Sequence, residues 1–213
     1  FQADNSSLSD RVKILKKDDE AFLVRVRREI SAMARAANHT EAVVKVHHGE
    51  TEGQPYIKME YVPGPSQALS DAIPDQLRKE FQGKTVDGEG IMIAAECLRR
   101  QLGDLFPLHL WIELQQFFFF KAAETLALLQ DKKLNIFHRD IKPSNILIVP
   151  EVADALIRWI NMAYDNPDRA EISLREELEG IKTVATPIKI CDFGLARSMS
   201  EQGVAFKGEE TLS

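Results

Sequence analysis

Two segments of this chain have patterns of apolar residues that predict helices. Residues 111–134 are mostly apolar and contain few helix-breaking residues, which predicts a long buried helix. The four consecutive phenylalanines at 117–120 are interpreted as core residues that pack on several sides of this helix. In the second segment the apolar side chains are Val152, Leu156, Trp159, Ile160 and Tyr164. Their spacing predicts a short amphipathic helix.

Charged and helix-breaking residues extend this pattern. The run Asn166-Pro167-Asp168 predicts the end of the amphipathic helix, and residues 171–181 predict a charged helix after it. Near the start of the chain, residues 19–37 have a helix-like pattern that stops before Asn38-His39.

Short apolar runs predict the strands. Residues 43–46 form one such run, and residues 57–64 read as a strand that ends in the turn signal Pro63-Gly64. Residues 145–148 and 188–191 read as two short buried strands.

The composition argues against several classes of protein. The formal net charge is -6 and the predicted pI is about 5.5, with no basic patch of the kind that nucleic acids or acidic membranes attract. No apolar run approaches about 18 residues, so no transmembrane helix is expected. The N-terminal residues lack the regions of a signal peptide. The two cysteines, Cys97 and Cys191, do not suggest a disulfide framework, which favours an intracellular, cytoplasmic location.

The candidate chemistry lies in two short motifs. One is His-Arg-Asp-Ile-Lys-Pro-Ser-Asn, from His138 to Asn145, and the other is Asp-Phe-Gly, beginning at Asp192. The carboxylate of Asp140 can orient an attacking hydroxyl group and accept its proton. The oxygens of Asn145 and Asp192 can hold Mg²⁺ against phosphate groups. Lys142 places a cation where a transferred phosphoryl group carries negative charge.

These motifs resemble those of the protein kinase superfamily, serine/threonine type. The resemblance implies an α+β, two-lobed fold with a small β-rich lobe and a mainly helical large lobe. It implies that residues 1–63 are a partial small lobe reaching the start of the hinge, and that residues 64–213 are a partial large lobe. His138 would be a structural residue that packs beneath the phenylalanine of Asp-Phe-Gly.

The same resemblance implies the cofactors ATP and Mg²⁺ and the residues that contact them. Asp140, Lys142 and Asn145 would be catalytic, and Asn145 and Asp192 would be the metal ligands. The positions implied to contact the nucleotide are Lys13, Glu29, Met59, Glu60, Val62, Leu147 and Asp192.

The small-lobe assignments follow from the order of these segments. Residues 12–17 resemble the strand that carries the ATP-binding lysine, and Lys13 fits that lysine best. Glu29, sixteen positions later, is its implied partner. Met59 would lie behind the adenine, and the main chain of Glu60 and Val62 would hydrogen-bond its edge.

The chain departs from the family pattern in several places. Arg11 stands where the family has a small residue that packs on the adenine, and residues 1–10 contain no glycine to form the phosphate-covering loop. No Ala-Pro-Glu motif follows Asp-Phe-Gly. We therefore expect a partial domain, incomplete at both ends. We also expect insertions at about residues 70–107, with residues 87–90 as a loop, and at about 150–187.

A protein serine/threonine kinase, or a large fragment of one, is the function that the sequence favours. Lys142, two residues after Asp140, favours serine and threonine over tyrosine as acceptors. The alternative is a catalytically silent kinase-like module that binds partners. The motif residues argue for the kinase, whereas Arg11 and the missing glycines argue for the silent module. The Lys142-Pro143 pair disfavours a lipid or small-molecule kinase.

The expected partner is a protein substrate, and nucleic acids and membranes are not expected. The second insertion is either a docking surface for a partner or a helical hairpin that packs on its own domain, and the hairpin is favoured. Arg139 is expected to receive an activation-loop phosphate. Thr211 is the candidate phosphorylation site, and the alternative is a plain solvated threonine.

Overall fold

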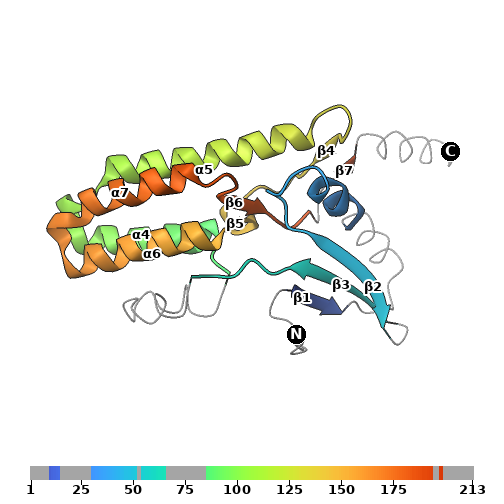
Figure 1. Cartoon of the computed structure of the whole chain (residues 1–213), viewed down its shortest axis with the longest axis horizontal. Helices are drawn as coiled ribbons and strands as arrows, with labels where there is room; N and C mark the ends of the chain where they lie inside the picture. The colour runs from blue at the N-terminus through green and yellow to red at the C-terminus, as the bar shows by residue number, and fades with distance from the viewer. Residues whose placement is uncertain (1–9, 15–29, 52–53, 66–84, 194–196, 199–213) are drawn as a thin grey trace, which may run out of the picture. The chain divides into compact units, whose positions relative to one another are not determined.

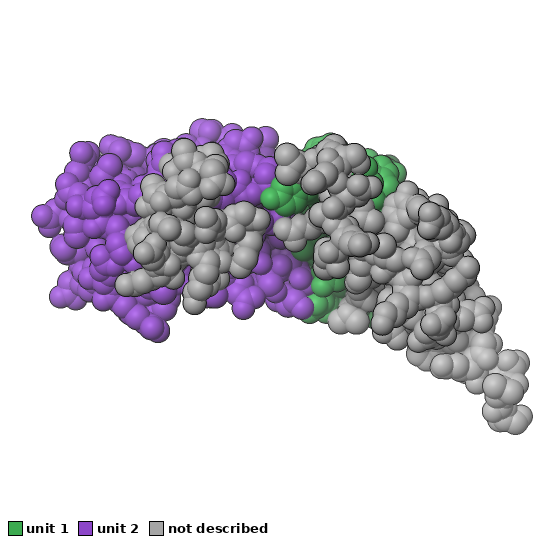
Figure 2. All heavy atoms as spheres, turned by 90° about the horizontal axis from the view of Figure 1, so that it is seen from below, with its two compact units in different colours: residues 1–61, 123–141, 191–213 green, residues 62–122, 142–190 purple. Residues whose placement is uncertain are grey.

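The computed structural model describes residues 10–14, 30–51, 54–65, 85–193 and 197–198. The chain divides into two compact units, which Figure 2 shows in different colours. Unit 1 comprises residues 1–61, 123–141 and 191–213, and unit 2 comprises residues 62–122 and 142–190. The lobe boundary and the two insertions inferred from the sequence stay predictions.

Unit 1 contains a three-stranded antiparallel sheet (Figure 1). Its strands are β1 (Asp10–Ile14), β2 (Val46–Thr51) and β3 (Gln54–Glu60), in the order β1-β3-β2. The register places Lys13 opposite Ile57 and Arg11 opposite Met59. The strands expected around Lys13 and before the Pro63-Gly64 turn are therefore confirmed.

The strand predicted at residues 43–46 is wrong over most of its length. Val43 and Val44 are buried, but the ladder with β3 begins only at Val46, opposite Met59. A short apolar run indicates that its residues are buried but does not by itself show that they form a strand. These two valines are buried without belonging to a strand of the sheet.

The rest of unit 1 consists of a helix and a short strand pair. Residues 30–37 are helical, which confirms the described part of the helix predicted at 19–37. The Arg35 guanidinium donates a hydrogen bond to the Leu134 carbonyl at 2.7 Å, which ties this helix to the segment before β4. Strand β4 (Ile136–Phe137) pairs antiparallel with β7 (Arg197–Ser198).

Unit 2 is built from long helices that lie lengthwise beside one another (Figure 1). They are α4 (Gly88–Leu102), α5 (Leu108–Leu129), α6 (Pro150–Asp165) and α7 (Ala170–Thr183), and α5 continues into unit 1 from residue 123. The short 3₁₀ turns are η1 (Gly103–Leu105), η2 (Pro143–Asn145) and η3 (Pro167–Arg169). Strands β5 (Ile146–Ile148) and β6 (Ile188–Ile190) pair antiparallel. The α+β prediction is confirmed, and so are α6, α7, the break between them and the two short strands.

Aromatic stacking holds the α6–α7 hairpin on its own unit. Trp159 of α6 is buried, and its ring stacks on that of Trp111 of α5 with centroids 5.9 Å apart. Its indole N–H donates to the Ala170 carbonyl at the start of α7, at 3.1 Å. The Lys182 ammonium on α7 also donates to Glu113 of α5 at 2.7 Å, which lowers the pKa of that carboxyl group. The hairpin interpretation of residues 150–187 is therefore confirmed.

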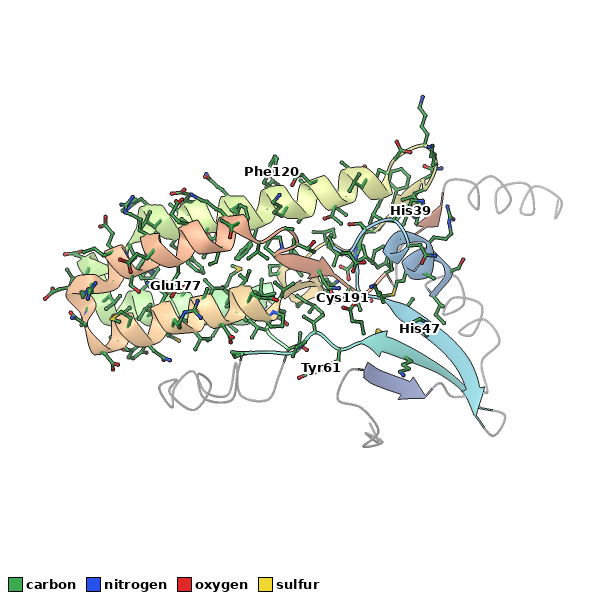
Figure 3. All side chains as sticks on the ribbon, viewed as in Figure 1. His39, His47, Tyr61, Phe120, Glu177 and Cys191 are labelled. Carbon is green, nitrogen blue, oxygen red and sulfur yellow. The ribbon has the colours of Figure 1, made fainter. Side chains whose placement is uncertain are left out.

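The phenylalanine run of α5 is not wholly in the core, so that interpretation is wrong. Phe119 is 77% exposed and Phe120 58% exposed, and Figure 3 shows Phe120 directed away from the other helices of unit 2. Successive helical residues point about 100° apart, so four in a row face nearly every direction, whereas unit 2 covers this helix on one side. The helix also spans 108–129 instead of the predicted 111–134.

The loop predicted at residues 87–90 is the N-terminus of α4. The Asp87 side chain accepts a hydrogen bond from the Gly90 N–H at 2.8 Å, which makes Asp87 the N-cap. Aspartate and glycine favour turns, but aspartate is also a preferred N-cap residue, and Asp87 adopts the N-cap role here. Within the described part of the chain, no helix is long and apolar enough to cross a membrane.

Candidate functional site

A buried histidine organises the candidate site residues of unit 1. His138 is 2% exposed, and its ring lies against that of Phe193 with centroids 4.5 Å apart. Its Nε2 hydrogen-bonds the Cys191 carbonyl at 3.0 Å, and its Nδ1 accepts from the Asp140 backbone N–H at 3.3 Å. The neutral ring with its proton on Nε2 satisfies both contacts. The predicted packing of His138 on Phe193 is therefore present.

This arrangement links the two candidate acidic residues of the site. Asp140 follows His138 by two positions and is hydrogen-bonded to it, whereas Asp192 directly follows Cys191, the other partner of the same ring. One imidazole thus fixes the main chain next to both carboxylates. Asp140 is half-buried and Asp192 is exposed.

The main chain has a left-handed residue next to each of the two contacts of His138. Arg139 has φ 67° and Asp192 has φ 60°, both in the left-handed region. For a residue with a side chain this conformation costs on the order of 1 kcal/mol. The surrounding hydrogen bonds and the His138–Phe193 contact hold it in place, and such outliers often mark functional sites.

Unit 2 carries three further residues that the sequence predicted for the site, Lys142, Asn145 and Leu147. Asn145 is the last residue of η2 and is 4% exposed, with its backbone N–H bonded to the Lys142 carbonyl at 3.0 Å. Lys142 itself is exposed. Leu147 lies in β5, half-buried, where it pairs with Lys189 and forms a bridge with Asp87.

The residues predicted to contact the adenine lie at the end of β3 and just beyond it. Met59 and Glu60 end this strand in unit 1, and Val62 is the first residue of unit 2 to follow. The Glu60 N–H donates to the Lys45 carbonyl at 2.8 Å, and the Val62 carbonyl accepts from Thr85 Oγ1 at 2.7 Å. Two main-chain groups of this segment are therefore already engaged within the protein.

The predicted lysine site is described only in part. Lys13 and Arg11 are two residues apart on β1. The implied partner of Lys13, Glu29, lies outside the described residues, as does Thr211. Arg139 is described and exposed.

The donor groups fit magnesium better than a transition metal. No three histidine, cysteine, aspartate or glutamate residues gather to hold a metal ion within the described ranges. Mg²⁺ commonly takes only one or two protein oxygens and completes its shell with phosphate and water. Asn145, in unit 2, offers an amide oxygen, and Asp192, in unit 1, offers a carboxylate, and each is a donor of that kind.

Sequence reasoning missed the contribution of Thr85, Asp87 and Gly88, which contact Val62 and the segment from Pro143 to Leu147. The sequence did contain a pattern that predicts a helix start at this segment. Asp87 precedes a run of buried residues at helical spacing, and an aspartate in that place is a recognised helix start. The apolar residues concerned are Ile91, Ala94, Ala95, Leu98 and Leu102.

Comparison with known proteins agrees with the motifs. The family model described as "Protein kinase domain" matches residues 9–211. The chain is 32% identical over 148 residues to a protein of Bifidobacterium longum (strain NCC 2705) named "Probable serine/threonine-protein kinase PknB". The match covers 64% of this chain but only 16% of that relative, so the chain spans a small part of the relative's length.

Proposed function

The chain belongs to the protein kinase family, and from that premise we propose that it transfers the γ-phosphoryl group of ATP to serine and threonine hydroxyls of proteins. The observation that carries this proposal is the double contact of His138. The ring binds the main chain of Asp140 and that of Cys191, next to Asp192, so the candidate base and a candidate metal ligand are positioned by one side chain.

Each motif residue has a proposed role in the transfer. Asp140 orients the acceptor hydroxyl and takes its proton. Asn145 and Asp192 hold Mg²⁺, which when bound offsets the charge of the phosphates. Lys142 stabilises negative charge on the transferred group.

Nucleotide binding is proposed for the residues around β1, β3 and β5. Lys13, paired with Glu29, would contact the phosphates. Met59 and Leu147 would pack on the adenine, and its edge would bond the main chain of Glu60 and Val62. The Glu60 N–H and the Val62 carbonyl are engaged within the protein, so a nucleotide that bonded either group would have to displace that hydrogen bond.

The silent kinase-like module remains the second candidate, and one observation favours it. Arg11 lies on β1 directly opposite Met59, the residue proposed to lie behind the adenine. An arginine next to that position would crowd or stack on a bound nucleotide, so nucleotide binding could be lost while the fold is kept.

One experiment separates the two candidates. Calorimetry with Mg-ATP measures binding, and radiolabelled ATP with peptides that carry only serine and threonine, or only tyrosine, measures transfer. The kinase proposal expects binding and magnesium-dependent labelling of the serine and threonine peptides. Absence of labelling, with or without nucleotide binding, would favour the silent module, and equal labelling of tyrosine peptides would overturn the acceptor assignment.

A docking partner on the second insertion is also proposed, and a groove in unit 2 gives it a place. A cavity of about 500 Å³ is lined by residues in and beside the α4–α5 and α6–α7 connections. These two connections lie at the same end of the helices (Figure 1). The apolar residues Leu105, Leu108 and Ile112 of the cavity are 43–53% exposed. It is also lined by the carboxylates Asp104, Asp168 and Glu171 and by His109.

The charged side chains of this groove indicate which kind of partner segment it would bind. Glu171 is paired with Arg175 at 3.1 Å and lies 3.8 Å from His109, whereas Asp104 and Asp168 form no ion pair within the described part of the chain. A segment of a protein substrate with basic and aliphatic side chains would therefore complement both the carboxylates and the exposed leucines.

Binding of short peptides checks the docking proposal. We expect a peptide of arginine, leucine and alanine to bind more tightly than versions with glutamate for arginine or serine for leucine. Changing Asp104→Asn together with Asp168→Asn should weaken binding about fivefold, because each exposed ion pair is worth up to about 1 kcal/mol. The matched control Glu151→Gln, at the opposite end of α6, should leave binding unchanged.

Two further assignments remain predictions. The pairing of Arg139 with a phosphate on Thr211 is proposed from sequence, and Thr211 lies outside the described residues. An intracellular, cytoplasmic location is likewise proposed from the composition.

A further inference from the structure

The segment 85–88 connects two parts of the candidate site within unit 2. Thr85 Oγ1 donates to the Val62 carbonyl at 2.7 Å, at the proposed adenine-binding segment. The Val86 carbonyl accepts from the Ile148 N–H at 2.8 Å, and Asp87 forms a bridge with Leu147. This segment therefore contacts both the main chain near the adenine edge and the strand that leaves the catalytic loop.

Gly88 makes the closest approach of this segment to the catalytic loop. A Cβ atom added at Gly88 would lie 2.9 Å from the Pro143 carbonyl oxygen and 3.3 Å from Pro143 Cα. Both are main-chain atoms, so no side-chain rotation can relieve the overlap, and one of the two backbones has to move.

Of the two backbones, α4 is the more firmly fixed. Asp87 caps its first turn, and Ile91, Ala94 and Leu98 bury it in the core of unit 2. Pro143, by contrast, belongs to the three-residue turn η2, which exposes Lys142 and Pro143. A side chain at residue 88 would therefore displace η2 rather than α4.

Displacing Pro143 would move the residues on either side of it. Lys142 precedes it directly, and Asn145 ends the same turn with its N–H bonded to the Lys142 carbonyl at 3.0 Å. Because this hydrogen bond joins the residues on both sides of Pro143, a shift of Pro143 is expected to move the backbones of Lys142 and Asn145 as well.

We propose that Gly88 is a positioning residue, which sets the place of Asn145 and Lys142 through the main chain of Pro143. This inference rests on the proposed function, since it concerns the metal ligand and the cation of the same transfer. Gly88 itself touches no substrate group, and it acts on Asn145 and Lys142 only through the main chain of Pro143.

The test compares Gly88→Ala with Gly180→Ala. Gly180 is a matched control because it also lies in a helix, and an added Cβ there meets nothing within 4 Å. For Gly88→Ala we expect kcat to fall about tenfold, since misplacement of a catalytic group by about 1 Å can cost on the order of 100-fold. The Mg²⁺ concentration for half-maximal rate should rise as well, because the Asn145 ligand has moved. Gly180→Ala should change neither quantity.

A second measurement does not depend on activity. The NMR signals of the Asn145 side-chain amide should shift in Gly88→Ala and stay in place in Gly180→Ala. Unchanged Asn145 signals would overturn the proposal, whether or not the wild type transfers phosphate. The proposal would also be overturned if kcat fell only in proportion to the amount of folded protein and the Mg²⁺ concentration for half-maximal rate did not change. Shifted Asn145 signals in a protein that never transfers phosphate would support the positioning role and count against the proposed function instead.

Discussion

Replacing Asp140 with asparagine should lower kcat at least about 100-fold and leave the affinity for ATP almost unchanged, which is the usual scale for losing a general base. The amide has the size of the carboxylate but cannot accept the proton of the acceptor hydroxyl. The contact of residue 140 with His138 uses its backbone N–H, so the change of side chain leaves that hydrogen bond in place. Steady-state kinetics and Mg-ATP calorimetry measure the two quantities separately.

A second aspartate provides the control for this variant. Asp165 is exposed at the end of α6, and Asp165→Asn makes the same chemical change outside the motifs. We expect this variant to keep the wild-type rate. If Asp140→Asn transferred phosphate as fast as Asp165→Asn, the assignment of Asp140 as the base would be wrong.

The largest expected effect on stability comes from Trp159→Ala. Trp159 is 1% exposed, stacks on Trp111, and lies 6.2 Å from Phe106 between ring centroids. Its loss would leave a large cavity between α5 and α6 and leave the Ala170 carbonyl without its indole donor. Changes of this kind cost about 3–5 kcal/mol, and we expect the free energy of unfolding to fall by that amount. Urea unfolding followed by far-UV circular dichroism measures it.

Two further variants make this test specific. Trp159→Phe keeps an aromatic ring in the core but loses the hydrogen bond to Ala170, so its loss of stability should be smaller. Phe119→Ala removes an aromatic ring that is 77% exposed, and surface changes are usually within about 0.5 kcal/mol. Equal losses for Trp159→Ala and Phe119→Ala would contradict the packing described for α6.

Local patterns made α6 and α7 predictable from the sequence. The apolar side chains from Val152 to Tyr164 repeat once per turn, and Pro167 marks the end of that repeat, so the elements follow from nearby residues alone. The motif around Asp140 was readable for a similar reason, since its chemistry depends on residue types at fixed spacing.

The sequence predictions that were wrong or incomplete concern features that depend on residues far apart in the chain. Phe119 and Phe120 are as apolar as their neighbours, and only the packing around α5 decides which of them the core covers. Val43 and Val44 are buried outside a strand, which a count of apolar residues cannot distinguish from a ladder. The closeness of Gly88 to Pro143 joins positions far apart in the chain, and no local pattern encodes such a contact.

The stacked pair of Trp111 and Trp159 decides what intrinsic fluorescence can report. These are the 2 tryptophans of the chain, and both lie in the core of unit 2. Tryptophan emission therefore follows the integrity of the helical unit and the separation of one ring from the other. Asp140 and Asp192 lie in unit 1, which contains neither tryptophan, whereas Asn145 and Leu147 lie in unit 2 with both. A change of emission during a nucleotide titration would therefore report on unit 2, and an optical probe beside Asp140 and Asp192 has to be introduced into unit 1.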